Sequence, residues 1–250
     1  MFKLFSKKKY FLKDYISEQF TDIHSHIIPG IDDGAKNIEQ SKKLLHRIQN
    51  NLGIKNMIPT PHTMHMVWDN TSENINKTFE ELRDEIKSEA SIEINLKQAA
   101  SEYFLDDHFI ALLEKNDILA IQGKYVLIEL AFGTAPLNLF DMLFKIQVAG
   151  YKPILAHPER YYYLHDTIEE FQKIKDTGCL LQLNLLSLTS YYGKDVQKVA
   201  EKLLKLDLID LVGSDIHHER HLDFLESKFL TDSMLEKLIP ALKNNEVLFN

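Results

Sequence analysis

The chain has 250 residues and a formal net charge of −8, and hydrophobic residues make up 44% of it. This composition supports a large buried core, and the length suits a single α/β barrel as well as two smaller domains. A nucleic-acid-binding protein would usually present a basic surface, which the acidic balance argues against.

Residues 1–19 are expected to form an N-terminal arm, and residues 20–250 a single domain. The arm carries Lys7, Lys8 and Lys9 but lacks the long apolar segment of a signal peptide. The arm is interpreted as frayed and solvated, with contact to an anionic membrane surface as the alternative. No apolar stretch reaches about 18 residues, so the chain is not expected to be an integral membrane protein.

Strand-like and helix-like segments then alternate along the chain. Apolar or β-branched runs predict strands at 20–24, 55–59, 92–99, 125–130, 153–156, 179–185 and 209–213. Stretches with helical spacing predict helices at 39–49, 74–89, 137–148, 168–175, 196–204 and 234–244. This alternation favours an α/β fold with a parallel sheet and crossover helices. About seven such units favour a (β/α) barrel over a doubly wound sheet, because no glycine-rich phosphate loop follows the first strand.

Cys179 is the only cysteine of the chain. It lies in an apolar run and is interpreted as a small buried hydrophobic residue. An intrachain disulfide is impossible, which fits a reducing compartment, and a cytoplasmic location is expected.

Histidines or acidic residues follow six of the seven predicted strands, whereas the sixth strand ends at Asn184. His24 and His26 are two residues apart and point the same way, because side chains alternate along a strand. At the carboxyl ends of barrel strands such residues share one site. A single histidine there would more often be structural, but the repeated pattern favours a metal cluster. The candidate ligands are His24, His26, Asp33, His62, Glu102, Glu129, His157, Asp215 and His217, with Asp32 adjacent to Asp33 in the first loop.

Imidazole and carboxylate ligands without thiolate suit manganese, iron, zinc or cobalt. The candidates are too many for one ion and suit two or three, with Glu102 as a possible bridge. Neighbouring divalent ions lower the pKa of a bridging water and hold the oxygens of an in-line displacement, which favours phosphoester hydrolysis. Arg160 and Arg220 each follow a histidine by three residues and are candidate phosphate-binding groups, with surface ion pairs as the alternative. The adjacent Tyr161–Tyr163 would stack on an aromatic substrate or pack in the core.

The sequence resembles the phosphoesterases of the PHP superfamily, and within them the bacterial tyrosine-protein phosphatases encoded with capsule and exopolysaccharide genes (CpsB/YwqE type). The resemblance extends from about residue 20 to the C-terminus, and its motifs together are highly specific. They are Asp22–His26, Pro29–Gly34, Thr60–His62, Glu102–Tyr103, Glu129, His157–Arg160 and Ser214–His217.

The resemblance implies a distorted seven-stranded (β/α) TIM-like barrel, the PHP fold, with three divalent ions. Manganese is the expected metal, and iron and zinc are the alternatives. The implied ligand sets are His24, His26, Glu102 and Asp215 for one ion, Glu102, Glu129 and His157 for a second, and Asp33, His62 and His217 for the third. Arg160 and Arg220 are implied to hold the phosphate while a metal-bridging hydroxide attacks phosphorus, without a phosphocysteine intermediate.

The implied substrate is phosphotyrosine on the tail of a membrane-bound bacterial tyrosine kinase that controls polysaccharide export. One alternative is a small-molecule phosphatase of the same superfamily, such as a histidinol phosphatase. Glu129 favours the tyrosine phosphatase, because many relatives outside that group have histidine there. The other alternative is a non-catalytic metal-binding scaffold, for which missing ligands or a basic surface would be expected, and the sequence has neither.

Overall fold

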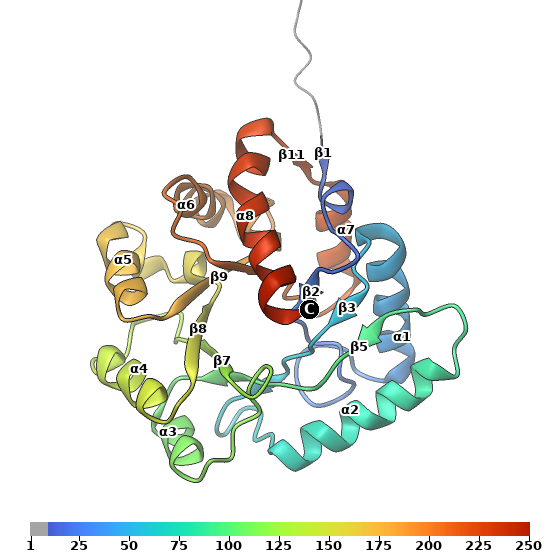
Figure 1. The fold of residues 1–250 in the computed structure, drawn as a ribbon, viewed down its shortest axis with the longest axis horizontal. Helices are drawn as coiled ribbons and strands as arrows, with labels where there is room; N and C mark the ends of the chain where they lie inside the picture. The colour runs from blue at the N-terminus through green and yellow to red at the C-terminus, as the bar shows by residue number, and fades with distance from the viewer. Residues whose placement is uncertain (1–9) are drawn as a thin grey trace, which may run out of the picture.

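Parallel strands occupy the middle of the molecule and helices surround them in this computed structural model, which describes residues 10–250 (Figure 1). The strands are β1 (Tyr10–Phe11), β2 (Thr21–Asp22), β3 (Asn56–Met57), β4 (His62–Thr63), β5 (Asn95–Leu96), β6 (Glu102–Phe104), β7 (Tyr125–Glu129), β8 (Lys152–Ala156), β9 (Leu180–Asn184), β10 (Leu211–Gly213) and β11 (Phe229–Leu230). The α-helices are α1 (Ile38–Arg47), α2 (Ser72–Lys87), α3 (Asp107–Glu114), α4 (Leu139–Val148), α5 (Ile168–Asp176), α6 (Lys194–Lys205), α7 (Glu219–Ser227) and α8 (Asp232–Phe249).

Apart from β1 and β11, the strands fall into two parallel sheets. One has six strands in the order β10-β9-β8-β7-β6-β4, and the other has three in the order β2-β3-β5. The segments β3 and β4 follow each other closely, as do β5 and β6, so two stretches of chain contribute to both sheets. All residues of β7 are buried, as expected for a strand covered on both faces. The predicted α/β fold with parallel strands is confirmed.

The first and last strand regions lie side by side without forming a continuous ladder. The Asp215 N–H donates to the His24 carbonyl at 2.8 Å, and the His26 N–H donates to the Ile216 carbonyl at 2.9 Å. Ser25 and Ile216 form an isolated parallel bridge. The structure therefore does not confirm the closed seven-stranded barrel expected from the sequence. The strands belong to separate sheets, and the first and last strand regions meet through these two hydrogen bonds and one bridge.

An apolar cluster lies where the strand segments converge. It includes Ile23, Ile58, Leu127, Ile154 and Leu211, which come from or directly follow β2, β3, β7, β8 and β10. The aromatic ring of Phe249 at the end of α8 belongs to the same cluster. This packing joins the first and last strands over a common interior and holds their carboxyl ends, where the polar residues follow, close together.

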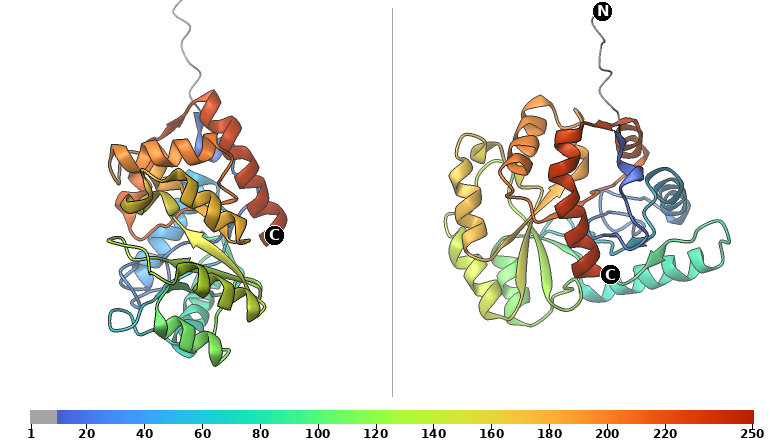
Figure 2. Two further views of the ribbon diagram at one scale, coloured as in Figure 1. Left: turned by 90° about the vertical axis from the view of Figure 1, so that its left-hand side faces the viewer. Right: turned by 45° about the horizontal axis from the view of Figure 1, so that its top comes forward.

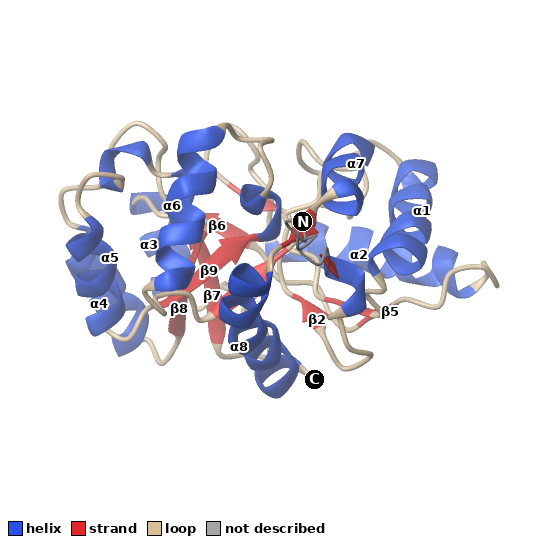
Figure 3. Ribbon diagram, turned by 90° about the horizontal axis from the view of Figure 1, so that it is seen from above, coloured by secondary structure: helices blue, strands red, loops and turns tan. Residues whose placement is uncertain are grey.

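The helices α1–α7 divide into two groups around the strands. Viewed from above, α3–α6 lie beside β6–β9, whereas α1, α2 and α7 lie beside β2 and β5 (Figure 3). The C-terminal helix α8, red in the right-hand view of Figure 2, lies between the two groups. Side-chain caps begin several of them: Asn37 accepts from the Gln40 N–H at α1, and Asp106 accepts from the Phe109 N–H at α3. The helices α3 and α7 were not predicted, because each is short and offers few turns of apolar periodicity.

The chain preceding β2 packs against the C-terminal part of the molecule. β1 pairs antiparallel with β11, and Leu12 is buried in the core. Ser17 donates a hydrogen bond to Glu246 of α8 at 2.7 Å. The solvated arm expected for residues 1–19 is therefore wrong for residues 10–19, while residues 1–9, including the three lysines, lie outside the described residues. Across residues 10–250, no helix is both long and apolar enough to cross a membrane.

Candidate metal centre

The predicted ligands lie at the ends of the parallel strands. His24 and His26 follow β2, His62 begins β4, Glu102 begins β6, Glu129 ends β7, His157 follows β8, and Asp215 and His217 follow β10. Asp33 lies in the loop between β2 and α1. Four overlapping groups have ligand atoms within 4.8 Å of one another: His26, Asp33, His62 and His217; His24, His26 and Asp215; His24, Glu102 and His157; and His62, Glu102 and Glu129. All nine candidates therefore lie in one continuous cluster.

Glu102 occupies the centre of this cluster and is fully buried. Its Oε2 atom lies 3.2 Å from His24 Nε2 and 3.5 Å from His26 Nε2. The same oxygen lies 3.2 Å from His62 Nδ1, and Oε1 lies 3.2 Å from His157 Nε2. A carboxylate that faces four imidazoles is well placed to be shared between neighbouring cations.

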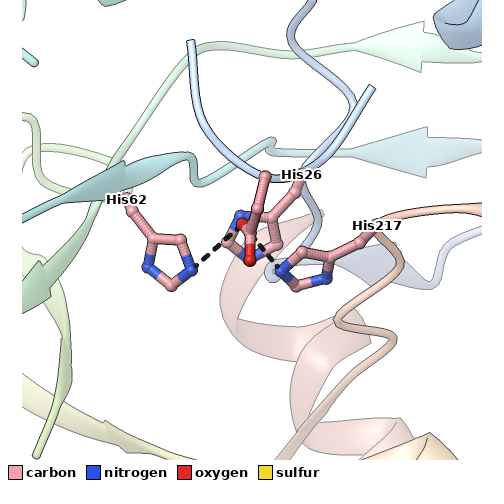
Figure 4. A group of neighbouring side chains, drawn as sticks. His26, His62 and His217 are labelled. Carbon is pink, nitrogen blue, oxygen red and sulfur yellow. Dashed lines mark ion pairs between the residues drawn. The ribbon is translucent and has the colours of Figure 1, made fainter. Parts of the chain in front are cut away.

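One end of the cluster opens toward solvent. Asp33 Oδ1 lies 3.6 Å from His62 Nε2 and 3.4 Å from His217 Nε2. The rings of His26 and His217 stack with centroids 3.8 Å apart, and Figure 4 shows these histidines grouped around one carboxylate. The side chain of Asp33 is 50% exposed, whereas that of Glu102 is 0% exposed. A ligand from solvent would therefore meet the Asp33 end first.

The two neighbouring aspartates of the first loop have different surroundings. Asp32 Oδ2 lies 2.8 Å from His26 Nδ1 and accepts the His62 N–H at 3.1 Å, and Oδ1 accepts the Gly34 N–H at 2.9 Å. Both oxygens of Asp32 are thus engaged in orienting the loop and the His26 ring. Asp33 instead faces two imidazole nitrogens, which makes it the better candidate ligand.

Several buried polar atoms at the centre have no hydrogen-bond partner among the residues the structure describes. They are His24 Nε2, His26 Nε2, His62 Nδ1, Glu129 Oε1 and both carboxylate oxygens of Glu102. Unpartnered buried polar atoms are costly and uncommon in proteins. These atoms point at one another from different strands, and their mixture of imidazole nitrogen and carboxylate oxygen fits divalent transition metals. The cluster is therefore suited to bind metal ions.

Three histidines of the cluster, His24, His26 and His217, have one ring nitrogen engaged by another group. His24 Nδ1 lies 2.8 Å from Gln182 Oε1, and His217 Nδ1 lies 2.9 Å from the Asp215 carbonyl oxygen. Together with the contact of His26 to Asp32, these bonds fix the ring orientation and leave Nε2 of each ring for a ligand. Metal-binding histidines are typically held in this way.

The buried carboxylates of the cluster carry negative charge that protons or metal ions have to balance. Burial by itself lowers the pKa of His24, but the carboxylates of Glu102 and Asp215 outweigh it and raise this pKa to about 9. Burial would raise the pKa of Glu102, yet the imidazoles of His24 and His62 hold it well below its usual range. Protons on these rings thus balance the buried carboxylates, and metal ions binding there would displace them.

The backbone around the cluster adopts conformations that side chains usually avoid. His157 has φ 35° and Asp215 has φ 51°, both in the left-handed region. Such strain concentrates at functional sites. Two glycines allow close approach of the chain to the histidines: a Cβ atom at Gly34 would lie 2.0 Å from the His26 carbonyl oxygen, and one at Gly213 would lie 2.6 Å from His24 Cβ.

A cavity of about 400 Å³ opens onto the cluster. Arg160 lies in its wall and pairs with Asp215 Oδ2 at 3.0 Å. The guanidinium carbon lies 4.7 Å from the ring centroid of Phe132 and 4.3 Å from that of Tyr192, so two aromatic rings orient it. Arg220 is exposed on α7 and lies over Tyr191 rather than in the cavity wall. The two arginines predicted to bind phosphate therefore have unequal access to the cluster.

Other residues of the site had weaker sequence signals. Phe132, Tyr191, Tyr192, Trp68 and His221 line the cavity beside the predicted ligands. None of these follows the strand-end pattern: His221 lies on α7, and the others lie on segments between the named strands and helices, whose course the sequence does not reveal. Asn184, passed over as a ligand, donates to Asp215 Oδ2 at 2.6 Å and thereby orients a candidate ligand.

Two further histidines and Tyr161 differ in their position relative to the cavity. His218 lines the cavity, whereas His65 pairs with Asp69 and stacks on His108 outside its wall. Tyr161 is fully buried, and its hydroxyl accepts the Leu130 N–H at 2.9 Å. Core packing is thus the role of Tyr161, while the aromatic rings that face the cavity belong to other segments.

Comparison with known proteins places the chain among proteins of capsule synthesis. Residues 20–224 match the family model for capsular polysaccharide synthesis, CpsB/CapC. The tyrosine-protein phosphatase CpsB of Streptococcus pneumoniae is 32% identical over 79% of this chain and 82% of its own length. A putative tyrosine-protein phosphatase CapC of Staphylococcus aureus is 28% identical over 91% of this chain and 90% of its own length.

Solved structures agree with this placement. One from a study of YwqE of Bacillus subtilis and CpsB of Streptococcus pneumoniae, metal-dependent tyrosine phosphatases, has a TM-score of 0.80 and 26% identity, covering 92% of this chain and 93% of that chain. The lactonase Lmo2620 of Listeria monocytogenes, at 12% identity and a TM-score of 0.55, covers 98% of both chains and shares the fold alone. By the extent of its family match and its identity to CpsB, this chain belongs to the CpsB/CapC family of capsular polysaccharide synthesis.

Proposed function

We propose that this protein is a metal-dependent tyrosine phosphatase that hydrolyses phosphotyrosine in proteins. The observation that carries the proposal is the position of Arg160 in the wall of a cavity that opens directly onto the ligand cluster. The cavity wall also contains Trp68, Phe132 and Tyr192, which suit an aromatic ring attached to the phosphate. The relatives that match most of this chain carry the same activity in their names.

We infer that the cluster holds three divalent ions, with manganese expected and iron or zinc as alternatives. His24, His26, Asp215 and Glu102 would hold one, and Glu102, Glu129 and His157 a second. Asp33, His62 and His217 would hold the third. The overlapping groups of ligand atoms support the first and third sets, and they add His26 as a neighbour of the third. For the second set, His157 Nε2 lies 3.9 Å from Glu129 Oε2, while the groups place His24 beside Glu102 and His157, and His62 beside Glu102 and Glu129. The surrounding strands would constitute the distorted seven-stranded barrel, within a single domain of residues 20–250.

Divalent ions bound there would lower the pKa of a water molecule and neutralise charge on the phosphoryl oxygens. The protein's own groups supply the positioning. Arg160 would bind two phosphate oxygens, because its guanidinium lies over the rings of Phe132 and Tyr192 and remains charged at all working pH values. The aromatic wall would orient the phenyl ring so that the phosphorus faces the cluster. Arg220 is proposed as a more distant contact for the same charge.

The substrate is proposed to be the phosphotyrosine-bearing tail of a membrane-bound bacterial tyrosine kinase, with hydrolysis taking place in the cytoplasm. Membership of a capsule-synthesis family supports a substrate of that pathway. The test compares the turnover of a phosphotyrosyl peptide with that of histidinol phosphate by manganese-loaded protein. Preferential hydrolysis of the peptide is expected, whereas a preference for histidinol phosphate would favour the small-molecule phosphatase, and inertness toward both would favour the scaffold.

Replacing Cys179 with serine is expected to leave the phosphatase rate within about twofold of wild type. The thiol is fully buried outside the cavity, and burial raises its pKa to about 12, so it stays protonated at neutral pH and is a poor nucleophile. The rate of para-nitrophenyl phosphate hydrolysis by both proteins, before and after treatment with iodoacetamide, checks this. Inactivation by the reagent in wild type alone would indicate a cysteine-dependent reaction instead.

A further inference from the structure

A β-hairpin stands beside the cavity and is closely held by its own hydrogen bonds. The Met64 N–H donates to the Trp68 carbonyl at 3.0 Å, and the Trp68 N–H donates to the Met64 carbonyl at 2.8 Å. Asp69 Oδ1 accepts the Met66 N–H at 2.8 Å and lies 3.0 Å from His65 Nδ1. The hairpin, residues 64–68, is therefore an ordered element whose tip position is determined by several bonds.

The tip of the hairpin presents apolar side chains to solvent at a conformational cost. Met66 is 82% exposed and Val67 is 58% exposed. Met66 also has φ 65°, a left-handed conformation that a bulky side chain seldom adopts and that costs stability. Neither the core nor the cavity wall uses the Met66 side chain. An apolar residue held in this way suggests contact with a binding partner.

Other residues of the same hairpin line the cavity. Met64, Val67 and Trp68 line the cavity, and the Trp68 ring stacks on His62 with centroids 4.7 Å apart and an interplanar angle of 12°. The hairpin thus runs without interruption from the ligand cluster, along the cavity wall, to the exposed Met66. A substrate that extends beyond the cavity on this side would contact this tip.

We propose that Met66 binds an apolar side chain next to the phosphotyrosine of a peptide substrate, which makes the hairpin a determinant of sequence preference. The inference rests on the proposed phosphatase function and specifies its substrate further. A small aryl phosphate would fill the cavity without reaching Met66, because Met66 is not part of the cavity wall. A peptide extends beyond the cavity, and the Met66 side chain is flexible and adapts to different apolar neighbours.

The test uses Met66→Asn, because asparagine tolerates a positive φ and should preserve the hairpin while removing the apolar tip. Val247→Ser is the matched control, since Val247 is 81% exposed on α8 and does not line the cavity. Each protein is loaded with manganese and assayed with para-nitrophenyl phosphate and with two phosphotyrosyl peptides. In one peptide leucine flanks the phosphotyrosine on both sides, and in the other serine does.

Wild type and Val247→Ser are expected to show a KM about fivefold lower for the leucine peptide than for the serine peptide, the size of a partly buried apolar contact. Met66→Asn should reduce this difference to within about twofold while its rate with para-nitrophenyl phosphate stays unchanged. Met66→Gly, which also suits positive φ, should behave in the same way.

Three results would overturn the proposal, and they distinguish failure of the hairpin's role from failure of the phosphatase function. Wild-type protein that hydrolyses all three substrates without preferring leucine, or a preference retained in both Met66 variants, would refute the role of the hairpin and leave the phosphatase function standing. Wild-type protein that hydrolyses none of the three would refute the phosphatase function itself, and with it the inference about Met66.

Discussion

Replacing Glu102 with glutamine is expected to lower kcat for a phosphotyrosyl peptide by at least about 10³-fold, the scale of losing a principal electrostatic group at a reaction centre. Glu102 is fully buried and approaches four imidazoles at 3.2–3.5 Å. Glutamine keeps the shape of the side chain but removes its charge and replaces one oxygen with an N–H donor. The cluster would then lose the group best placed to join neighbouring cations.

Metal content and thermal unfolding distinguish this effect from misfolding. The variant should retain a cooperative unfolding transition but bind fewer ions per chain, so manganese should raise its Tm less than it raises that of wild type. Glu73→Gln is the matched control, because Glu73 is an exposed residue in the first turn of α2. Wild-type metal content and activity in the Glu102 variant would mean that Glu102 does not bind metal.

Replacing Arg160 with alanine is expected to lower kcat/KM by about 10²- to 10³-fold with metal content unchanged. Lysine at this position should recover little of the loss, because it cannot bind two phosphate oxygens in one plane or stack between Phe132 and Tyr192 in the same way. Activity of both variants toward a phosphotyrosyl peptide, with metal content measured in parallel, checks this expectation.

Arg220→Ala is the informative comparison for Arg160. Arg220 is exposed and outside the cavity wall, so its charge is well screened and its removal should cost less than about tenfold in kcat/KM. Equal losses in the two alanine variants would show that both arginines contact the phosphate, as the sequence resemblance implies. A loss at Arg220 alone would contradict the role assigned to Arg160.

The candidate ligands could be predicted from the sequence because their signal is local. His24 and His26 share a strand face by their spacing, and Glu102 and Glu129 are acidic residues beside apolar runs, where an unpaired charge is costly. Parallel strands bring their carboxyl ends to one side, so residues far apart in the sequence could be assigned to one site. The different roles of Asp32 and Asp33 depend on loop geometry, and spacing alone could not separate them.

Features that depend on long-range packing could not be predicted from the sequence. The pairing of β1 with β11 joins residues at opposite ends of the chain, and nothing in the composition of residues 10–19 indicates it. The break between the sheets that contain β2 and β10 likewise involves residues far apart in the sequence. Phe132 and Trp68 reach the cavity from loops, and Met66 lies on a hairpin tip whose positive φ has no marker in the sequence, since the residue is not glycine or asparagine.

Two quantities measured on the full chain test whether the cluster is the metal centre of a phosphatase. They are the rate of hydrolysis of a phosphotyrosyl peptide and the number of divalent ions bound per chain. Protein purified without chelator should contain three ions per chain. Chelation should remove the ions and abolish activity, and adding manganese back should restore bound ions and activity. Hydrolysis that continues at the original rate after all divalent ions have been removed would contradict the central claim that this strand-end cluster is the metal centre of a phosphatase.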